Sequence, residues 1–341
     1  MRIGLITPPW VPVPPPAYGG LEAVVDRLAR GLADAGHDVL LAAPGNSECP
    51  VPCVPGLPVA HPEAGIIAET NVEMRHVVMA YDAMADRELI HDHTIAGPLY
   101  RHRPPGVPVV VTNHGPFDEN TNVLFAAMAG DTAIVAISQN QADTAEGVAV
   151  TRVIHHGMDV APVPVGDGGG GYALFLGRMN PTKGAREAVE IARAAGVPLR
   201  LAAKMREDAE HDYFDSEIKP LLGDEVEYVG EVDEVGKYEL LGEAIAMLNP
   251  IQWEEPFGLV MIESLACGTP VVTTSTGSVP EIIDDGKTGW IRDDHEELAD
   301  ALRRVAELDR AACRKAAETR FTTDRMVADH LALYEELTAG S

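Results

Sequence analysis

The stretch EEPFGLVMIESLACG, residues 254–268, sets acidic side chains into a segment of mostly apolar and small residues. It lies between IAMLNP (245–250) and TPVVTTS (269–275), which are typical of buried strands. The pattern predicts a loop, then a helix that starts near Phe257 or Gly258 and stops at the final glycine of the stretch. A helix between two strands in this way is a unit of a parallel sheet.

The N-terminus of this helix is a predicted anion site, because free backbone N–H groups at Phe257, Gly258 and Leu259 and the positive end of the helix dipole favour phosphate. Glu255 stands just outside that site. Glu263 lies about two turns into the apolar helix, where a buried carboxylate is costly unless its oxygens accept hydrogen bonds. Hydroxyl groups of a ligand would supply the donors. The alternative is that Glu255 complements the helix dipole and Glu263 meets a neighbouring side chain or solvent.

Strand-like runs alternate with helical stretches along the chain, which predicts parallel sheets covered on both faces by helices. The helix predicted over 20–36 shows the pattern well, with apolar side chains such as Leu21, Leu28 and Leu32 on one side and charges on the other. The strand-like runs are 2–7, 37–44, 88–93, 107–114 and 132–138 in the first half, and 172–177, 197–203, 226–230, 245–250, 269–275 and 288–292 in the second.

A proline- and glycine-rich stretch, APVPVGDGGGG (161–171), interrupts the alternation and is suited to a linker. Its GDGGGG segment satisfies G-x-G-x-x-G, but it precedes a strand instead of following one, so it does not indicate a dinucleotide site. The sequence therefore predicts an α/β protein of two doubly wound domains that face each other. Ligands of such sheets bind beyond the carboxyl ends of the strands, so an interdomain cleft is the expected site.

Composition limits the possible partners. The chain is long enough for about two domains, and it carries 53 acidic against 26 basic residues, a formal net charge of −27. This charge argues against nucleic acid or an anionic membrane as the main partner. No apolar run approaches the roughly 20 residues that span a bilayer, and the N-terminus lacks a signal-peptide layout, so we expect a soluble, cytoplasmic protein. The four scattered cysteines predict neither a disulfide framework nor a zinc site.

The stretch FLGRMNPTKG (175–184) places Arg178 and Lys183 in the loop after a strand. In so acidic a protein, two local cations of this kind would neutralise a diphosphate and its growing charge without a metal. The alternative is a surface ion pair. The stretch is not a Walker loop, because no glycine precedes the lysine and no serine or threonine follows it.

Together these motifs resemble the retaining glycosyltransferases of family 4, which adopt the GT-B fold. The family's E-x7-E spacing begins at Glu255, and the resemblance is strongest over residues 172–292. The other matching motifs are SLACGTPVV (264–272), GRMNPTKG (177–184), PPAYGG (15–20) and GSVPEII with DGKTGW (277–290). Three positions depart from the common pattern: Lys204 lies where many relatives have a glycine-rich turn, His156 replaces an asparagine and Ser278 replaces a glycine.

The resemblance implies roles for individual positions. Glu255 would bind hydroxyls of the donor sugar, and Glu263 the ribose hydroxyls of the nucleotide. Arg178 and Lys183 would hold the diphosphate and stabilise the departing nucleoside diphosphate, and His93 would approach the donor sugar. The implied catalytic set is His93, Arg178, Lys183 and Glu255, and the implied donor-binding set is Gly19, Gly20, His114, Val229, Gly230, Phe257, Gly258, Leu259 and Glu263.

The donor-binding set draws on both predicted domains. By the same resemblance, Gly19 and Gly20 would bring backbone N–H groups from the loop before the first helix to the phosphates. The base would lie near Val229 and Gly230, and His114 would be a second residue of the cleft. Outside the family context, lone histidines at strand ends are usually structural.

The family layout also assigns the domains: residues 1–165 would bind the acceptor and 166–321 the donor, and a helix over 322–341 would pack back onto the first domain. No metal is expected at IHDHT (90–94), because side chains alternate along a strand and only two of its acidic and histidine side chains would share a face. The chain also lacks a D-x-D triplet. No cofactor is expected beyond the nucleotide-sugar substrate, of the UDP or GDP type.

We therefore expect a metal-independent retaining transferase that moves a sugar from a nucleotide-diphosphate donor to a hydroxyl of a small-molecule or oligosaccharide acceptor. The leaving phosphate would assist attack on the same face, since no Asp or Glu is an obvious nucleophile. A basic amphipathic face for membrane association is lacking, and the composition and size resemble antibiotic-tailoring members such as those of the avilamycin pathway. Two alternatives stay open: a sugar-nucleotide epimerase or hydrolase, and a sugar-nucleotide-binding module without turnover.

Overall fold

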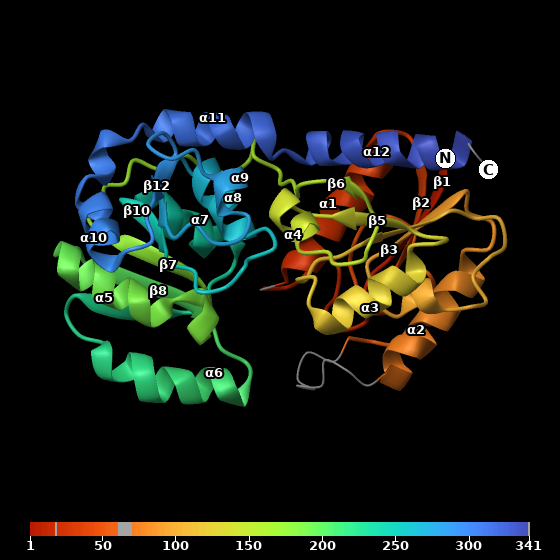
Figure 1. Cartoon of the computed structure of the whole chain (residues 1–341), viewed down its shortest axis with the longest axis horizontal. Coiled ribbons are helices and arrows are strands. Elements are labelled where there is room, and N and C mark those ends of the chain that lie inside the picture. Colours follow the sequence, from red (N-terminus) through yellow and green to blue (C-terminus); the bar gives the residue numbers. More distant parts are fainter. Residues whose placement is uncertain (18, 61–69, 340–341) are drawn as a thin grey trace. The chain divides into compact units, whose positions relative to one another are not determined.

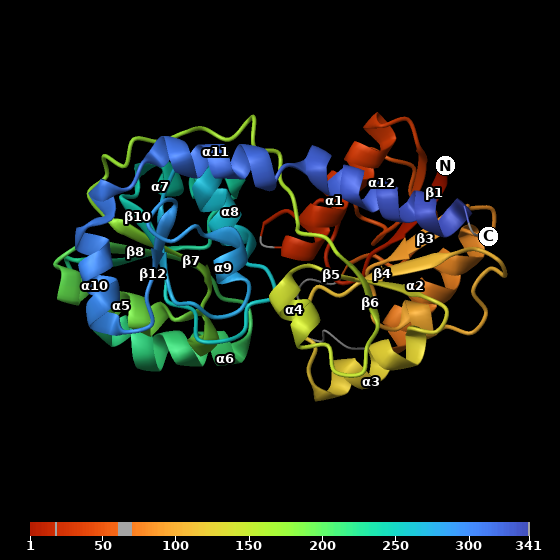
Figure 2. The same cartoon turned by 45° about the horizontal axis from the view of Figure 1, so that its top comes forward.

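The computed structural model describes residues 1–17, 19–60 and 70–339, and the chain divides into two compact units (Figure 1). The units are Met1–Gly157 with Thr323–Ser341, and Met158–Thr322. Each is built on a parallel sheet with helices on both faces, as two views show (Figures 1 and 2). This confirms the predicted α/β architecture of two doubly wound domains.

The first unit holds six parallel strands among the described residues, in the order β2-β1-β3-β4-β5-β6. The strands are β1 (Arg2–Ile6), β2 (Asp38–Ala42), β3 (Leu89–Asp92), β4 (Val109–Thr112), β5 (Ala133–Ala136) and β6 (Val150–Val153). The helices are α1 (Gly20–Asp34), α2 (Thr70–Ala83), η1 (Gly97–Leu99), α3 (Glu119–Met128), α4 (Gln139–Asp143) and α12 (Thr323–Ala339). The sequence did not predict β6, because this edge strand is only partly buried and lacks the continuous apolar run of the others.

The second unit also holds six parallel strands within its described residues, in the order β12-β11-β10-β7-β8-β9. The strands are β7 (Ala173–Arg178), β8 (Leu199–Lys204), β9 (Val226–Gly230), β10 (Ala246–Asn249), β11 (Val271–Thr273) and β12 (Gly289–Ile291). The α-helices are α5 (Ala185–Ala195), α6 (Asp208–Tyr213), α7 (Glu234–Glu243), α8 (Leu259–Ala266), α9 (Val279–Ile282), α10 (His295–Arg303) and α11 (Arg310–Arg320). In the described part of the chain, no helix has the length and apolar character that a membrane span requires.

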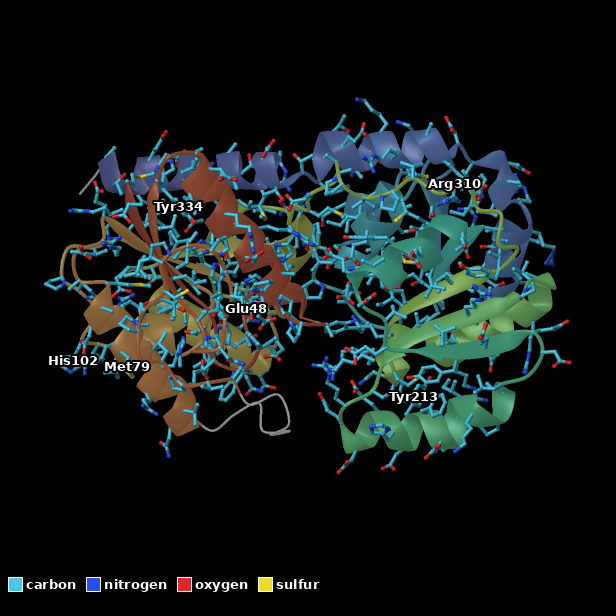
Figure 3. All side chains as sticks on the ribbon, turned by 180° about the vertical axis from the view of Figure 1, so that it is seen from behind. Glu48, Met79, His102, Tyr213, Arg310 and Tyr334 are labelled. Atoms are coloured by element: carbon cyan, nitrogen blue, oxygen red, sulfur yellow. The ribbon has the colours of Figure 1, made fainter. Side chains whose placement is uncertain are left out.

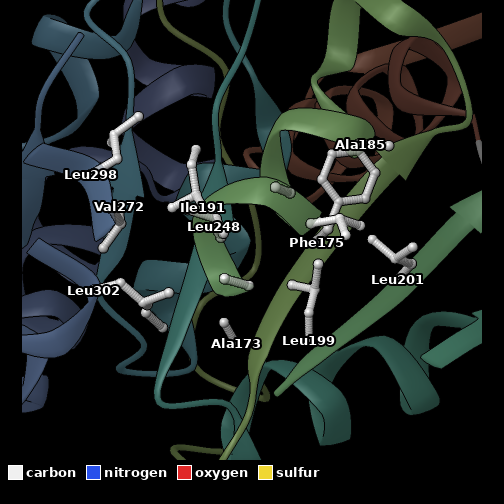
Figure 4. Close-up of a cluster of buried hydrophobic side chains, with 14 of the residues drawn as sticks. Ala173, Phe175, Ala185, Ile191, Leu199, Leu201, Leu248, Val272, Leu298 and Leu302 are labelled. Carbon is white, nitrogen blue, oxygen red and sulfur yellow. The ribbon is translucent and has the colours of Figure 1, made fainter. Parts of the chain in front are cut away.

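Apolar side chains from the sheet and its helices fill the core of the second unit (Figure 4). Phe175 of β7, Leu201 of β8, Leu248 of β10 and Ile191 of α5 are at most 1% exposed. Burying each such side chain stabilises the fold by about 2 kcal/mol. The core thereby fixes the carboxyl ends of the strands, where the loops discussed below begin.

The proline- and glycine-rich stretch 161–171, which the sequence suggested as a linker, lies within the second unit and is hydrogen-bonded to other parts of it. The N–H of Gly166 donates to the carbonyl oxygen of Cys267 at 3.0 Å. Its own carbonyl oxygen accepts a hydrogen bond from Nε of Arg310 on α11, also at 3.0 Å (Figure 3). The units divide at Gly157, ahead of this stretch. The assignment of acceptor binding to the first unit and donor binding to the second stays a prediction.

The C-terminal helix α12 packs against the first unit. Gly31 of α1 lies so close to it that a Cβ there would be 2.5 Å from Cγ2 of Val327. Tyr334 is fully buried, and its hydroxyl lies 2.6 Å from Nδ1 of His91 in β3 (Figure 3). The last helix of the chain is therefore part of the core of the first unit.

Candidate active site

Each sheet has a topological switch point, where the strand order reverses and where ligands of such folds bind. In the second unit it lies between the paired strands β7 and β10. β7 ends at Arg178 and β10 at Asn249, and the loops that follow them carry Lys183 and Glu255. The topology therefore brings the two segments that the sequence singled out to one edge of the sheet.

The turn that carries Lys183 is fixed to the loop after β10. Oδ1 of Asn180 accepts hydrogen bonds from N and Oγ1 of Thr182 at 2.9 and 2.8 Å. The carbonyl oxygen of Thr182 accepts from N of Gln252 at 2.9 Å. Gly184 has φ of 80°, and a Cβ there would lie 2.0 Å from a carbonyl oxygen of the β10 loop. Glycine is thus needed for the close approach of the two loops.

Lys183 and Glu255 form an ion pair in which Nζ contacts Oε2. Trp253 donates its indole N–H to the same oxygen at 2.8 Å. Nζ of Lys183 also lies 5.0 Å from the centroid of the Trp253 ring. The side chains of the pair are 18% and 14% exposed, so water screens them only partly. The structure brings these two predicted residues together and adds Trp253, which the sequence analysis missed.

The loop before α8 packs closely on the segment that follows β11. Gly277 has φ of 66°, and a Cβ there would lie 2.4 Å from N of Glu255. The N–H of Gly277 donates to Oε2 of Glu254 at 2.8 Å, and that of Ser278 donates to the carbonyl oxygen of Glu255 at 3.0 Å. Oγ of Ser278 donates to the carbonyl oxygen of Phe257 at 2.5 Å. Ser278, which departs from the family pattern, is therefore hydrogen-bonded to the loop before α8, where the anion site is predicted.

Helix α8 starts and stops as predicted. Gly258, with φ of 81°, precedes Leu259, the first helical residue. The segment ends at Gly268, which has φ of 73°. The first N–H groups of a helix have no partner within it, so this helix begins with donors a few residues after Glu255.

Glu263 is paired with a lysine inside the second unit. Nζ of Lys237 in α7 donates to Oε1 of Glu263 at 2.6 Å, and the side chains are 19% and 10% exposed. The pairing offsets the cost of burying the carboxylate. It fits the alternative in which Glu263 meets a neighbouring side chain, and the ribose contact stays a prediction. Sequence reasoning missed Lys237, because it lies in a helix without a motif, 26 residues away.

Arg178, the last residue of β7, meets a different pair of carboxylates. Its Nε donates to Glu210 at 2.8 Å and its Nη2 to Glu207 at 2.7 Å. Burial alone would raise the pKa of Glu210, but hydrogen bonds from the backbone N–H of Arg206 and from Arg178 hold that pKa below its ordinary value. Burial and the charge of Arg178 lower the pKa of Lys204, the last residue of β8, which pairs with Arg178 in the sheet. This end of the sheet thus gathers cations that acids hold in place.

Histidine side chains form a row in the first unit. The ring centroids of His91 and His93 are 4.1 Å apart, and His330 of α12 lies 5.2 Å from His91. Continuing from His93, His114 lies 5.1 Å away, and His156 stacks on His114 at 5.2 Å. Burial lowers the pKa of every member, to about 3 for His114 and about 4 for His330, so these rings are neutral at pH 7.

Two nitrogens of this row lack a partner. Nδ1 of His93 lies 2.9 Å from Nε2 of His114, whereas Nε2 of His93 and Nδ1 of His114 have no hydrogen-bond partner among the described residues. Both rings are neutral, so each has one N–H. Whichever ring donates across the contact, one of the two remaining nitrogens then carries a hydrogen and the other a lone pair. The pair is suited to a hydroxyl group, which donates and accepts.

The remaining predicted positions also lie where strands end or helices begin. Gly19 is the N-cap of α1 and Gly20 its first residue. Val229 and Gly230 are the last two residues of β9. Their contacts with a donor stay predictions. Over the described ranges 1–17, 19–60 and 70–339, no three or more His, Cys, Asp or Glu side chains gather in a way that could hold a metal ion.

Family models match both halves of the chain. Residues 165–320 match the model of the glycosyl transferases group 1, and residues 18–161 match that of glycosyltransferase family 4. The two matches are consecutive and leave out only short segments.

Whole proteins and solved structures give the same result. The phosphatidyl-myo-inositol mannosyltransferase of Mycolicibacterium smegmatis is 26% identical over 343 residues, which cover 91% of this chain and 86% of that protein. The crystal structure of AviGT4, a glycosyltransferase involved in avilamycin A biosynthesis, is 27% identical with a TM-score of 0.73, and the match covers 100% of this chain and 99% of AviGT4.

A second solved structure shares the fold at lower identity. The Anabaena protein Alr3699/HepE, in complex with UDP and glucose, is 17% identical with a TM-score of 0.77 over 99% of this chain and 100% of that protein. The chain has two Rossmann-like sheets, two consecutive family matches and relatives that match over nearly their full length. It therefore belongs to family 4 of the glycosyltransferases and has the GT-B fold.

Proposed function

We propose that this glycosyltransferase retains the configuration of the transferred sugar, needs no metal and uses a nucleotide-diphosphate sugar of the UDP or GDP type. The observation that carries the proposal is the ion pair of Lys183 with Glu255 at the β7–β10 switch point, next to the N-terminus of α8. A lysine and a helix N-terminus together favour a diphosphate. Binding would let Lys183 exchange one anion for another, so its charge would stay paired throughout.

The same exchange would free Glu255 for the sugar. Once Lys183 contacts the diphosphate, the carboxylate of Glu255 can accept hydrogen bonds from donor-sugar hydroxyls. Glu263 would accept from the ribose hydroxyls while Lys237 holds its other side. Arg178, at the end of β7, would add a second cation for the phosphates. The base would lie against Val229 and Gly230 at the end of β9.

Transfer then requires the bond between the anomeric carbon and the leaving phosphate oxygen to break. Its electron pair goes to that oxygen, where Lys183 and Arg178 stabilise the new charge. The acceptor hydroxyl attacks the same face of the sugar and passes its proton to the leaving phosphate, which gives retention. In the first unit, the neutral pair of His93 and His114 would bind hydroxyls of a sugar, since an imidazole without charge both donates and accepts.

For the acceptor we propose a hydroxyl of a small molecule or oligosaccharide. AviGT4, which acts in avilamycin A biosynthesis, matches the chain over its full length at 27% identity. This supports antibiotic tailoring as the first context to examine.

A thermal-shift panel of UDP, GDP, ADP and dTDP tests the donor site, because a ligand that binds only the folded state raises its apparent stability. UDP comes first, since the Anabaena protein of the same fold was crystallised with it. One nucleotide should shift the midpoint by several degrees, and four null results would contradict the proposal.

Turnover separates this function from its alternatives. With the matching donor, nucleotide should be released only when acceptor is present, EDTA should not reduce the rate, and NMR of the product should show the donor's anomeric configuration. Release at the same rate without acceptor would indicate a hydrolase or epimerase. Nucleotide binding with no turnover for any acceptor would indicate a binding module.

A further inference from the structure

We propose that Trp253 is a positioning residue that holds Lys183 and Glu255 in one arrangement and so prepares the carboxylate for the donor sugar. The inference rests on the proposed function. Trp253 lies in the loop between β10 and α8, is only half-buried and is not a member of the core of the second unit. Its place is therefore not explained by packing of the fold.

Trp253 contacts both members of the ion pair in different ways. Its indole N–H donates to Oε2 of Glu255 at 2.8 Å, and the face of its ring lies 5.0 Å from Nζ of Lys183. A cation is attracted to the face of an indole ring. One rigid side chain thus fixes the separation of a carboxylate and an ammonium group that come from two different loops.

One carboxylate oxygen of Glu255 remains available to a ligand, because both partners contact the other oxygen. Lys183 and Trp253 both meet Oε2 of Glu255, and among the described residues no donor meets Oε1. The indole N–H would keep the carboxylate in this orientation after Lys183 has turned to the phosphates. Oε1 can then accept a hydrogen bond from a sugar hydroxyl.

The face of the Trp253 ring also lets the ammonium group of Lys183 change its hydrogen-bond partners. An ammonium group has three N–H donors, and a contact with a ring face uses the charge without requiring a particular donor. Lys183 can therefore stay over Trp253 while its donors pass from Glu255 to the diphosphate. The indole acts through these two residues and makes no bond in the reaction itself.

Two substitutions separate the contacts. Trp253→Phe keeps a ring face but removes the N–H, so kcat should fall about 10-fold or more, because a hydrogen bond to a charged group is lost, while UDP affinity stays within about 3-fold. Trp253→Leu removes both contacts, and UDP affinity should fall several-fold further. Trp290→Phe, in the same unit, is the matched control and should leave both values unchanged. Parent values of kcat in both Trp253 variants would overturn the proposal.

An NMR experiment tests the same contact without an activity assay. The chain has three tryptophans, so the indole 1H–15N resonance of Trp253 is assigned as the one that disappears in Trp253→Phe. Glu255→Gln should move this resonance upfield, because the acceptor loses its charge, and UDP should move it as Lys183 changes partners. A resonance that does not respond to Glu255→Gln contradicts the positioning contact. If instead the parent enzyme binds no nucleotide and transfers no sugar while the resonance responds, the proposed function fails and the contact stands.

Discussion

The two units are both built on six parallel strands among their described residues, but their candidate sites differ in charge. Both are parallel sheets whose functional candidates lie at the carboxyl ends of the strands, but the second unit gathers lysines and arginines paired with carboxylates, and the first gathers neutral imidazoles. Ion pairs can exchange an internal anion for a diphosphate, whereas neutral rings suit hydroxyl groups. On the proposed function, this comparison explains how a protein with a net charge of −27 would bind an anion: acids hold the cations locally, and the ligand would replace those acids.

The largest expected effect on activity comes from removing Lys183, the cation of the second unit's candidate site. Lys183→Ala takes away the cation next to the leaving phosphate, so kcat should fall by about 10²–10³-fold, as for loss of one stabilising donor in other enzymes. The circular dichroism spectrum should match that of the parent. Lys219→Ala removes an exposed lysine of the same unit and serves as the control. Equal turnover in Lys183→Ala and the control would contradict the role of Lys183.

The second effect concerns Glu263. Lys237→Met keeps much of the length of the side chain but removes its charge, which leaves a mostly buried carboxylate without its cation. We expect a loss of stability on the order of 2 kcal/mol in urea unfolding. Lys237→Met combined with Glu263→Gln should recover most of it, because the uncompensated charge is gone. A double variant as unstable as the single one would show that the pair does not act as a unit.

The histidine row should respond to pH in a way that the charged unit does not. The pKa of His330 is lowered to about 4 from an ordinary 6.5. Between these values the unfolded chain binds a proton that the folded chain does not, so this contribution to stability is lost as the pH falls, by at most about 1.4 kcal/mol per pH unit.

Asp92 and Glu22 of the same unit give the opposite slope, because burial raises each pKa to about 7. The test is therefore a difference: urea unfolding of the parent and of His330→Gln at several pH values between 4 and 6.5. The parent should lose more stability than the variant as the pH falls. Parallel curves would mean that this ring is charged or exposed in the folded protein.

The smallest expected effect on stability tests how α12 is held in the core of the first unit. The hydroxyl of Tyr334 lies 2.6 Å from Nδ1 of His91, and both side chains are fully buried. Tyr334→Phe should cost about 1 kcal/mol in the free energy of unfolding, because a buried nitrogen loses its partner. Tyr100→Phe is the control, since its hydroxyl has no hydrogen-bond partner in the described part of the chain. A loss of unfolding free energy no larger than in the control would show that this hydrogen bond does not stabilise the protein.

Local patterns predicted much of this molecule. The apolar runs marked every strand except β6, and the glycines at 258 and 268 marked both ends of α8. The motif around Lys183 and that around Glu255 met as expected, because topology places the ends of β7 and β10 side by side.

What sequence reasoning missed are partners that only the fold brings together. Lys237 reaches Glu263 from another helix, and Glu207 and Glu210 reach Arg178 from the start of α6, after the neighbouring strand β8. His330 joins the histidine row from the C-terminal helix. None of these belongs to a motif, and their pairing depends on contacts between distant segments. Trp253 directly precedes the stretch 254–268 in the sequence, but its hydrogen bond to Glu255 depends on the shape of the loop.

The most direct test of the central claim, that a diphosphate replaces Glu255 as the partner of Lys183, is a crystal structure with UDP. The account predicts Nζ of Lys183 about 3 Å from a phosphate oxygen, the ribose hydroxyls on Glu263, and the indole of Trp253 still bonded to Glu255. UDP phosphates bound away from the β7–β10 loops, with Lys183 still on Glu255, would contradict it.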